Sequence, residues 1–146
     1  MKRIASLWGP VLVWAGLIFY LSSIPDLSSG LKEDFLLRKC AHVVEFAVFA
    51  GFLWRAFRGS RPLPVRALAV LSFFLAVLYA ASDEWHQSFV PGRSCDVFDW
   101  LADTAGAALA VTLYVKWAWY RRLLEIRVGP QRQVEKPAET APNPPV

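Results

Sequence analysis

The chain has 146 residues, of which 55% are hydrophobic and 19% are charged, and its mean hydropathy is +0.34. This length predicts one domain, and this composition lies outside the range of ordinary soluble domains. The formal net charge is +4. An excess of Lys and Arg on the cytoplasmic side of a membrane protein explains such a charge, so no nucleic-acid partner is needed to account for it. The composition therefore predicts an integral membrane protein with the lipid bilayer as its main partner.

The first apolar segment covers residues 4–22 and contains no charged residue. A helix needs about 20 mostly apolar residues to cross the hydrocarbon core, and Pro10 lies early enough to kink such a helix without breaking it. Lys2 and Arg3 resemble the start of a signal peptide, but the apolar run is too long and no small-x-small cleavage site follows it. We expect a first span that is retained.

Three further apolar segments follow, at residues 40–57, 65–81 and 97–119. The first and third of the four segments are apolar all round, whereas helices of soluble bundles carry polar stripes. The sequence thus predicts an all-α fold, a four-helix transmembrane bundle, within a domain at residues 1–128. Residues 129–146 are polar and Pro-rich and are predicted to form a disordered cytoplasmic tail.

Basic residues set the predicted orientation. Lys and Arg are concentrated near the amino end, between the second and third segments, and after the fourth segment, which is one side of an even-numbered bundle. Under the positive-inside rule this side faces the cytoplasm. Both termini are therefore predicted to be cytoplasmic, whereas residues 26–33 and 89–92 face the extracytoplasmic side.

Most acidic residues fall on that extracytoplasmic side, where the second and fourth segments begin and the third ends. Helical spacing places one set of residues on a narrow face of the fourth helix, namely Asp96, Asp99, Asp103, Gly106, Ala107 and Ala110. The small members of this set permit close approach to a neighbouring helix, so the acids should point into the bundle.

Two other helices should contribute polar faces at the same depth. Arg38, His42, Glu45 and Phe49 share a stripe on the second helix, with Lys39 one turn before His42. If the third helix persists to Gln87, then Tyr79, Asp83, His86 and Gln87 project together. A charge in the membrane costs roughly 2.5–3.5 kcal/mol, so these groups must be paired, hydrated, protonated or metal-bound. We expect them to converge on a polar pocket.

Candidate roles follow from side-chain chemistry. Carboxylates and imidazoles in a partly dry pocket are suited to moving protons, and the candidate acid–base residues are His42, Glu45, Asp83, Glu84 and His86. Candidate ligand-binding residues are Arg38, Lys39, Gln87, Arg93, Asp96, Asp99 and Asp103. The Pro91-Gly92 turn either presents Arg93 to the pocket for bidentate binding of an anion or lets it pair with Asp96 or Asp99.

Three classes of function stay open at this point. In the first class, the polar residues form a site that binds or processes an anionic lipid head group or an envelope precursor. In the second they form a proton relay, and in the third a structural ion-pair lattice in a non-enzymatic scaffold. The inner halves of the third and fourth segments offer no continuing polar path for a relay. His42, His86 and the carboxylates are acceptable zinc or manganese ligands, but their separations match no known ligand spacing. No metal is assigned, and the cofactor stays unknown.

Other motifs lack the context that they need. Residues 83–86 read DEWH, but no phosphate-binding G-x-x-x-x-G-K-[ST] loop accompanies them. H-E-x-x-H, G-x-S-x-G and C-x-x-C are absent from the sequence. Cys40 and Cys95 both fall on the extracytoplasmic side, where they either form a disulfide or serve as small packing residues.

Three motifs in order carry a family resemblance. They are K-x-x-H-x-x-E-F at residues 39–46, S-D-E-x-H-Q-x-F-x-P-G-R at residues 82–93, and D-x-x-x-D-x-x-G at residues 99–106. This arrangement, together with the S-S-I-P exit from the first segment, resembles the VanZ-like family, named for a protein linked to teicoplanin resistance. Phe46 stands where Tyr is commoner. The resemblance implies a small multi-pass protein of the bacterial cell membrane, linked to the envelope and to glycopeptide resistance, and leaves its biochemical activity open.

Overall fold

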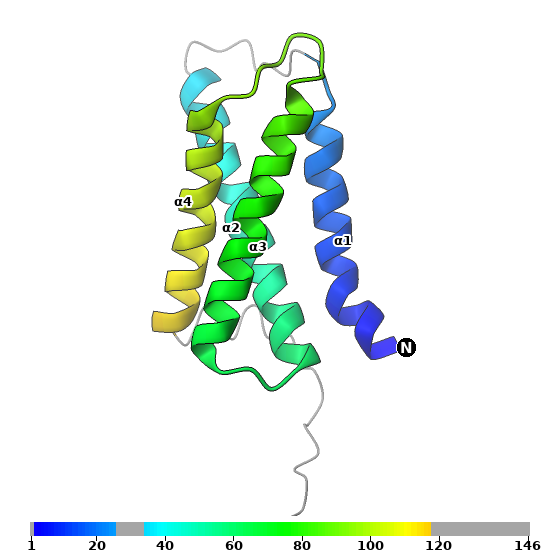
Figure 1. Ribbon diagram of the computed structural model, residues 1–146, viewed down its shortest axis with the longest axis vertical. Coiled ribbons are helices and arrows are strands. Elements are labelled where there is room, and N and C mark those ends of the chain that lie inside the picture. Colours follow the sequence, from blue (N-terminus) through cyan, green and yellow to red (C-terminus); the bar gives the residue numbers. More distant parts are fainter. Residues whose placement is uncertain (1, 26–33, 118–146) are drawn as a thin grey trace, which may run out of the picture.

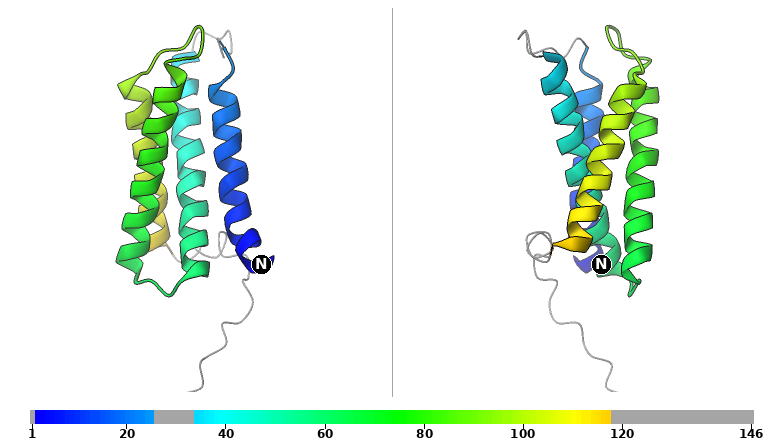
Figure 2. Two further views of the ribbon diagram at one scale, coloured as in Figure 1. Left: turned by 45° about the vertical axis from the view of Figure 1, so that its right-hand side comes forward. Right: turned by 90° about the vertical axis from the view of Figure 1, so that its left-hand side faces the viewer.

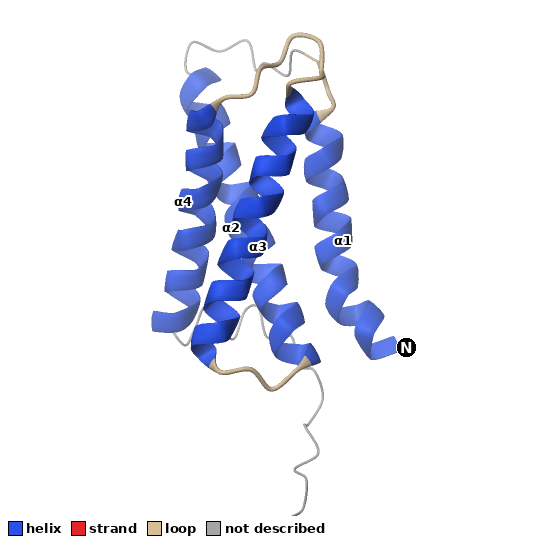
Figure 3. Ribbon diagram, viewed as in Figure 1, coloured by secondary structure: helices blue, strands red, loops and turns tan. Residues whose placement is uncertain are grey.

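The computed structural model describes residues 2–25 and 34–117, and these residues form four α-helices and no strand (Figure 3). The helices are α1 (Lys2–Ser22), α2 (Asp34–Ser60), α3 (Val65–Gln87) and α4 (Val97–Lys116). The all-α prediction is confirmed. The predicted end of the fourth segment at residue 119 and the predicted tail at residues 129–146 lie outside the described residues.

The helix boundaries differ from the predicted apolar segments mainly where polar residues continue a helix. α2 begins at Asp34 and α3 ends at Gln87, because helical hydrogen bonding extends beyond the apolar run that a hydropathy pattern detects. Pro64 precedes α3 in an extended conformation, and the side chain of Asp96 caps α4 by accepting a hydrogen bond from the Phe98 N–H. α4 ends at Lys116, before the extended residue Trp117.

α2 occupies the centre of the bundle and packs against each of the other three helices (Figures 1 and 2). α1 contacts α2 and α3 but makes no contact with α4. The end of α1, the start of α2 and the loop between α3 and α4 lie together at the upper end of Figure 1. This polar end, as we call it, is therefore built from all four helices.

A close backbone contact holds α2 against α4 near the polar end. A Cβ added at Gly106 would lie 2.2 Å from the backbone oxygen of Val43, so only glycine fits there. Ala107 and Ala110 are buried on the same face of α4. These small residues bring the two helices close together, as the sequence pattern predicts.

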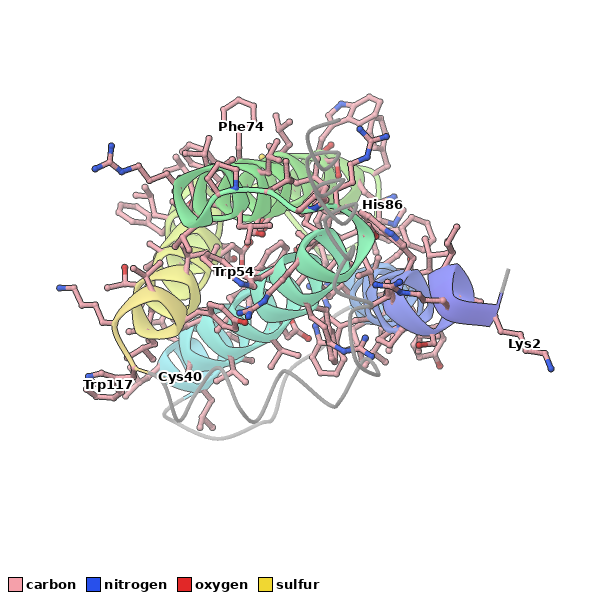
Figure 4. All side chains as sticks on the ribbon, turned by 90° about the horizontal axis from the view of Figure 1, so that it is seen from below. Lys2, Cys40, Trp54, Phe74, His86 and Trp117 are labelled. Atoms are coloured by element: carbon pink, nitrogen blue, oxygen red, sulfur yellow. The ribbon has the colours of Figure 1, made fainter. Side chains whose placement is uncertain are left out.

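The apolar core fills the bundle below the polar end. Phe46, Phe49 and Leu53 of α2 are fully buried, with Ala76 of α3 packed in the same cluster. Near the opposite end, the ring of Trp54 lies 4.2 Å from that of Tyr114, and Figure 4 shows Trp54 within the bundle.

Many large apolar side chains lie on the outside of the bundle. Val13, Val70 and Phe74 are more than half exposed, and Phe74 points away from the helices in Figure 4. α1 and α3 are long and apolar enough to cross a membrane by their length and composition. An outer surface of this kind is typical of a protein that meets lipid or a partner surface and not water alone.

Candidate functional site

The polar end brings together the candidate residues that the sequence analysis selected. Six of them are buried, namely His42, Asp83, Glu84, Gln87, Asp99 and Asp103. Lys39, Glu45, His86, Arg93 and Asp96 are partly buried, and Arg38 is exposed. The helices reach this end in opposite directions, so residues more than fifty positions apart in the sequence come into contact.

Lys39 forms the centre of an ion-pair cluster. Its Nζ lies 2.6 Å from Asp99 Oδ1 and 2.9 Å from Asp96 Oδ2. Arg38 Nη2 is 3.5 Å from Asp99 Oδ2, at the limit of a hydrogen bond. The Asp99 side chain is only 1% exposed, whereas that of Arg38 is 48% exposed. Lys39 is therefore the principal counter-charge of a buried carboxylate.

Asp96 has two roles at the start of α4. The hydrogen bond from Lys39 lowers the pKa of Asp96, and the bond from the Phe98 backbone N–H lowers it further. A lowered pKa means that the stability contributed by Asp96 is present above its ordinary pKa and is lost as the pH falls through the lowered value. This side chain is one-third exposed, so the effect is screened by solvent and salt.

His42 lies between two buried aspartates. Its Nδ1 is 2.9 Å from Asp103 Oδ1, and its Nε2 is 3.6 Å from Asp99 Oδ1. The other oxygen of Asp103, Oδ2, is buried and has no hydrogen-bond partner. A buried polar atom of this kind requires an explanation because its desolvation is not compensated.

A hydrogen-bonded chain connects α1, α3 and the start of α4. Glu84 Oε2 accepts a 2.8 Å hydrogen bond from the Asp96 backbone N–H, and Gln87 Nε2 donates to Asp83 Oδ2 at 2.9 Å. Ser22 Oγ donates to the other oxygen of Asp83. Ser22 was not among the predicted site residues, although it is the first serine of the S-S-I-P motif, and a serine pair at the end of an otherwise apolar segment is the feature that indicates a polar role.

Arg93 joins the loop after α3 to the end of α1. Its guanidinium donates to the backbone oxygens of Leu21 and Ile24 at 2.9 and 3.1 Å, and to Gln87 Oε1 at 3.1 Å. Gly92 has a φ of 78°, which favours glycine and turns the chain toward α1. The pairing of Arg93 with Asp96 or Asp99 that the sequence left open is not the one observed.

His86 faces α1 and not the carboxylate cluster. Its ring stacks on Phe19, with centroids 4.4 Å apart, and its Nε2 lies 3.0 Å from Ser23 Oγ. It lines a cavity of about 350 Å³ between α1 and α3 whose other walls include Tyr79 and Trp85. The structure thus separates the two histidines, which the sequence analysis had placed in one pocket.

A second cavity, of about 190 Å³, lies at the polar end among α1, α2 and α3. We call it the polar pocket, and its lining residues are Ile18, Leu21, Ser22, Arg38, Ala41, His42, Glu45, Asp83, Gln87 and Arg93. Within residues 2–25 and 34–117, no hydrogen bond or ion pair engages the Glu45 carboxylate. The polar pocket therefore contains an uncommitted carboxylate beside an imidazole and a half-exposed guanidinium.

Two further arrangements concern metal and sulfur chemistry. His42, Glu84 and Asp103 each offer a ligand atom, and these atoms lie within 4.8 Å of one another. His86, which the sequence analysis had considered as a ligand, is not part of this group.

Cys40 and Cys95 are both free and exposed, so the structure shows neither the disulfide nor the packing role.

Most of the site residues described so far belong to the three motifs at residues 39–46, 82–93 and 99–106 that carry the family resemblance. A family model described as VanZ/LLP1 matches residues 7–120, which is most of the chain. The chain belongs to the VanZ/LLP1 family. Comparison with curated proteins and with solved structures returned no match.

Every residue of the polar pocket and of the Lys39 ion-pair cluster lies within the matched part of this VanZ/LLP1 chain. Phe46, at the position where the sequence departs from the commoner Tyr, is fully buried 6.3 Å from the ring of Tyr79. The Tyr79 hydroxyl is used elsewhere, because it donates to the Ala15 backbone oxygen at 2.7 Å.

Proposed function

We propose that this VanZ/LLP1 protein is a multi-pass protein of the bacterial cell membrane, with all four helices crossing the bilayer and both termini in the cytoplasm. The apolar outer surface of the bundle supports this, as do the two helices that meet the length and hydropathy requirements. Asp99 and Asp103 of α4 and His42 of α2 are buried, and Glu45 of α2 is partly buried. The bilayer would then meet apolar side chains, and the polar end would be extracytoplasmic.

Cysteine labelling tests this orientation, because the two native cysteines are exposed, Cys40 near the start of α2 and Cys95 in the loop between α3 and α4. We expect a membrane-impermeant maleimide to label Cys40 or Cys95 in intact cells. In a variant without these cysteines, Ser60→Cys at the opposite end should be labelled only after the cells are permeabilised. Labelling of Ser60→Cys in intact cells would reverse the orientation and place the polar pocket at the inner leaflet.

We further propose that the polar pocket binds the anionic head group of a lipid or of a cell-envelope precursor. The observation that carries this proposal concerns Arg38, which lines the pocket with a half-exposed side chain. Among the described residues, its one ion pair is the 3.5 Å contact with Asp99. Arginine suits phosphate and carboxylate because its planar fork donates two parallel hydrogen bonds. Ile18, Leu21 and Ala41 add apolar walls that would contact the adjoining acyl or prenyl chain.

Glu45 and His42 give the polar pocket an acid–base capacity. The Glu45 carboxylate has no hydrogen-bond or ion-pair partner within the described part of the chain, and His42 Nδ1 lies 2.9 Å from Asp103 Oδ1. Groups of this kind transfer protons when a substrate lies within hydrogen-bonding distance. Action on an envelope precursor is the link we infer between this site and the glycopeptide resistance for which the family is named.

A purely structural ion-pair lattice explains fewer of the polar side chains at the polar end than a binding site does. Lys39, Asp96 and Asp99 neutralise one another, but Glu45 and Arg38 are left largely uncommitted. A proton relay across the membrane is less well supported, because the residues below the polar pocket are the apolar core residues Phe46 and Phe49. Binding at the extracytoplasmic end is therefore the function that the geometry supports best.

Thermal stability in neutral detergent tests the head-group proposal. Short-chain phosphatidylglycerol should raise the melting temperature of the wild-type protein, because a ligand that binds only the folded state stabilises it. Arg38→Gln should abolish most of this shift, whereas Arg61→Gln, an exposed arginine at the opposite end, should retain it. Phosphatidylcholine, whose head group has no net charge, should shift the melting temperature of all three proteins less than phosphatidylglycerol shifts that of the wild-type protein. Equal responses of the two variants to phosphatidylglycerol would refute a role for Arg38.

A further inference from the structure

We propose that His42, Glu84 and Asp103 bind a divalent transition-metal ion, zinc or manganese, where α2, α3 and α4 meet. Each helix contributes one residue, all three residues are buried, and their ligand atoms lie within 4.8 Å of one another. This group lies behind the polar pocket, because His42 lines that pocket but Glu84 and Asp103 do not. The inference goes beyond the proposed head-group site and does not depend on it.

The charge balance at the polar end supports a cation at this position. Lys39 pairs with both Asp96 and Asp99, whereas the half-exposed Arg38 makes only a 3.5 Å contact with Asp99 among the described residues. Among the described residues, no Lys or Arg nitrogen lies within ion-pair distance of the Glu84 or Asp103 carboxylate, and only His42, with Nδ1 2.9 Å from Asp103 Oδ1, faces Asp103 at such a distance. Buried carboxylates are costly unless they are paired or coordinate a metal. A divalent ion would neutralise both of them.

The unsatisfied oxygen of Asp103 is an independent indication. Asp103 is 0% exposed, and its Oδ2 has no hydrogen-bond partner, although its Oδ1 is 2.9 Å from His42 Nδ1. This free acceptor belongs to the same carboxylate that faces His42 and Glu84. A metal ion would supply the partner that the protein does not.

The ligand chemistry favours zinc or manganese. One imidazole and two carboxylates suit these ions, whereas magnesium and calcium prefer ligands that are all oxygen. Zinc holds nitrogen and oxygen ligands at about 2.1 Å, so its ligand atoms lie roughly 3.4 Å apart. Side-chain shifts of about 1 Å would bring the three donors into that range.

The close packing of α2 on α4 holds two of the three ligands in fixed relative positions. His42 and Asp103 lie one and three residues from Val43 and Gly106, the pair in backbone contact. Ligands carried on rigid helices are held more precisely than ligands on loops. The same contact that requires glycine therefore positions two of the three ligands.

Direct metal binding to the full-length protein in detergent is the decisive experiment. The protein is stripped with a chelator and titrated with zinc chloride or manganese chloride alone, and bound metal is measured by mass spectrometry. We expect about one ion per chain and an increase in melting temperature of about 5 °C at saturating metal. Wild-type protein that retains no stoichiometric zinc or manganese would overturn the proposal.

Matched variants locate the site. Asp103→Asn and Glu84→Gln keep the side-chain shape and should weaken metal binding at least tenfold, whereas His86→Asn, the other histidine, should leave it unchanged. Arg38→Gln should also keep the ion, so failure of the head-group proposal would not affect this result. Loss of metal in His86→Asn but not in Asp103→Asn would contradict the assignment.

A spectroscopic readout on the wild-type protein covers the case in which a variant does not fold. Cobalt substituted for zinc should give visible absorption bands of a site with nitrogen and oxygen ligands, and these bands should persist in His86→Asn. Zinc should displace them in a one-to-one titration. Cobalt that binds without such bands, or that zinc does not displace, would show adventitious binding and refute the site.

Discussion

Replacing Lys39 by Met should destabilise the bundle by about 3–5 kcal/mol, the cost of removing one partner from a buried ion pair. Lys39 Nζ is 2.6 Å from Asp99 Oδ1, and the Asp99 side chain is 1% exposed. Without Lys39, the nearest cation is Arg38 at 3.5 Å, which solvent already screens. Thermal unfolding in detergent, with the folded fraction followed by size-exclusion chromatography, measures the loss.

A charge-matched control and a double variant separate this effect from a general one. Lys116→Met, at the exposed last turn of α4, should cost less than about 0.5 kcal/mol. Adding Asp99→Asn to Lys39→Met should restore much of the stability, because the stranded charge is removed. If Lys39→Met and Lys116→Met have equal stability, the buried ion pair does not hold the polar end together.

Gly106→Ala is expected to cost about 3 kcal/mol, the upper part of the range for inserting a methyl group into a packed interface. The new Cβ would lie 2.2 Å from the Val43 backbone oxygen and 2.9 Å from its carbonyl carbon. Backbone cannot rotate aside as a flexible side chain does, so α2 and α4 must separate. The melting temperature should fall, and bound metal should fall with it because His42 and Asp103 move apart.

Gly16→Ala is the matched control for that substitution. Nothing lies within 4 Å of a Cβ built at Gly16 in α1, and alanine favours a helix over glycine by up to about 1 kcal/mol. This variant should therefore be as stable as the wild-type protein or more stable. A Gly106→Ala protein that matches Gly16→Ala in stability would rule out the close approach of α2 and α4.

Hydrophobic runs and helical periodicity were sufficient to predict the helices themselves. The four segments expected at residues 4–22, 40–57, 65–81 and 97–119 each contain most of an observed helix. Hydropathy marks where a helix is apolar and not where it ends, so the predicted segments stopped short of both ends of α2 and of the end of α3, whereas the start of α3 at residue 65 was predicted correctly. The small-residue face of α4 was also predictable, because spacing along one helix fixes which residues share a face.

The sequence by itself determined which residue types gather at the polar end, since the chain order of apolar segments brings the ends of successive helices together. It also placed Asp99 and Asp103 on an inward face, because small residues share that face. These are properties of single helices and of their order. They need no knowledge of how one helix is rotated against another.

Only the tertiary structure decided the partners. Arg93 contacts the end of α1, His86 stacks on Phe19, and His42, Glu84 and Asp103 form the group that can hold a metal. These contacts join residues far apart in the sequence, and their geometry depends on the axial shift and rotation of whole helices. Periodicity along one helix carries no information on either quantity, because both are set by the packing of side chains between helices.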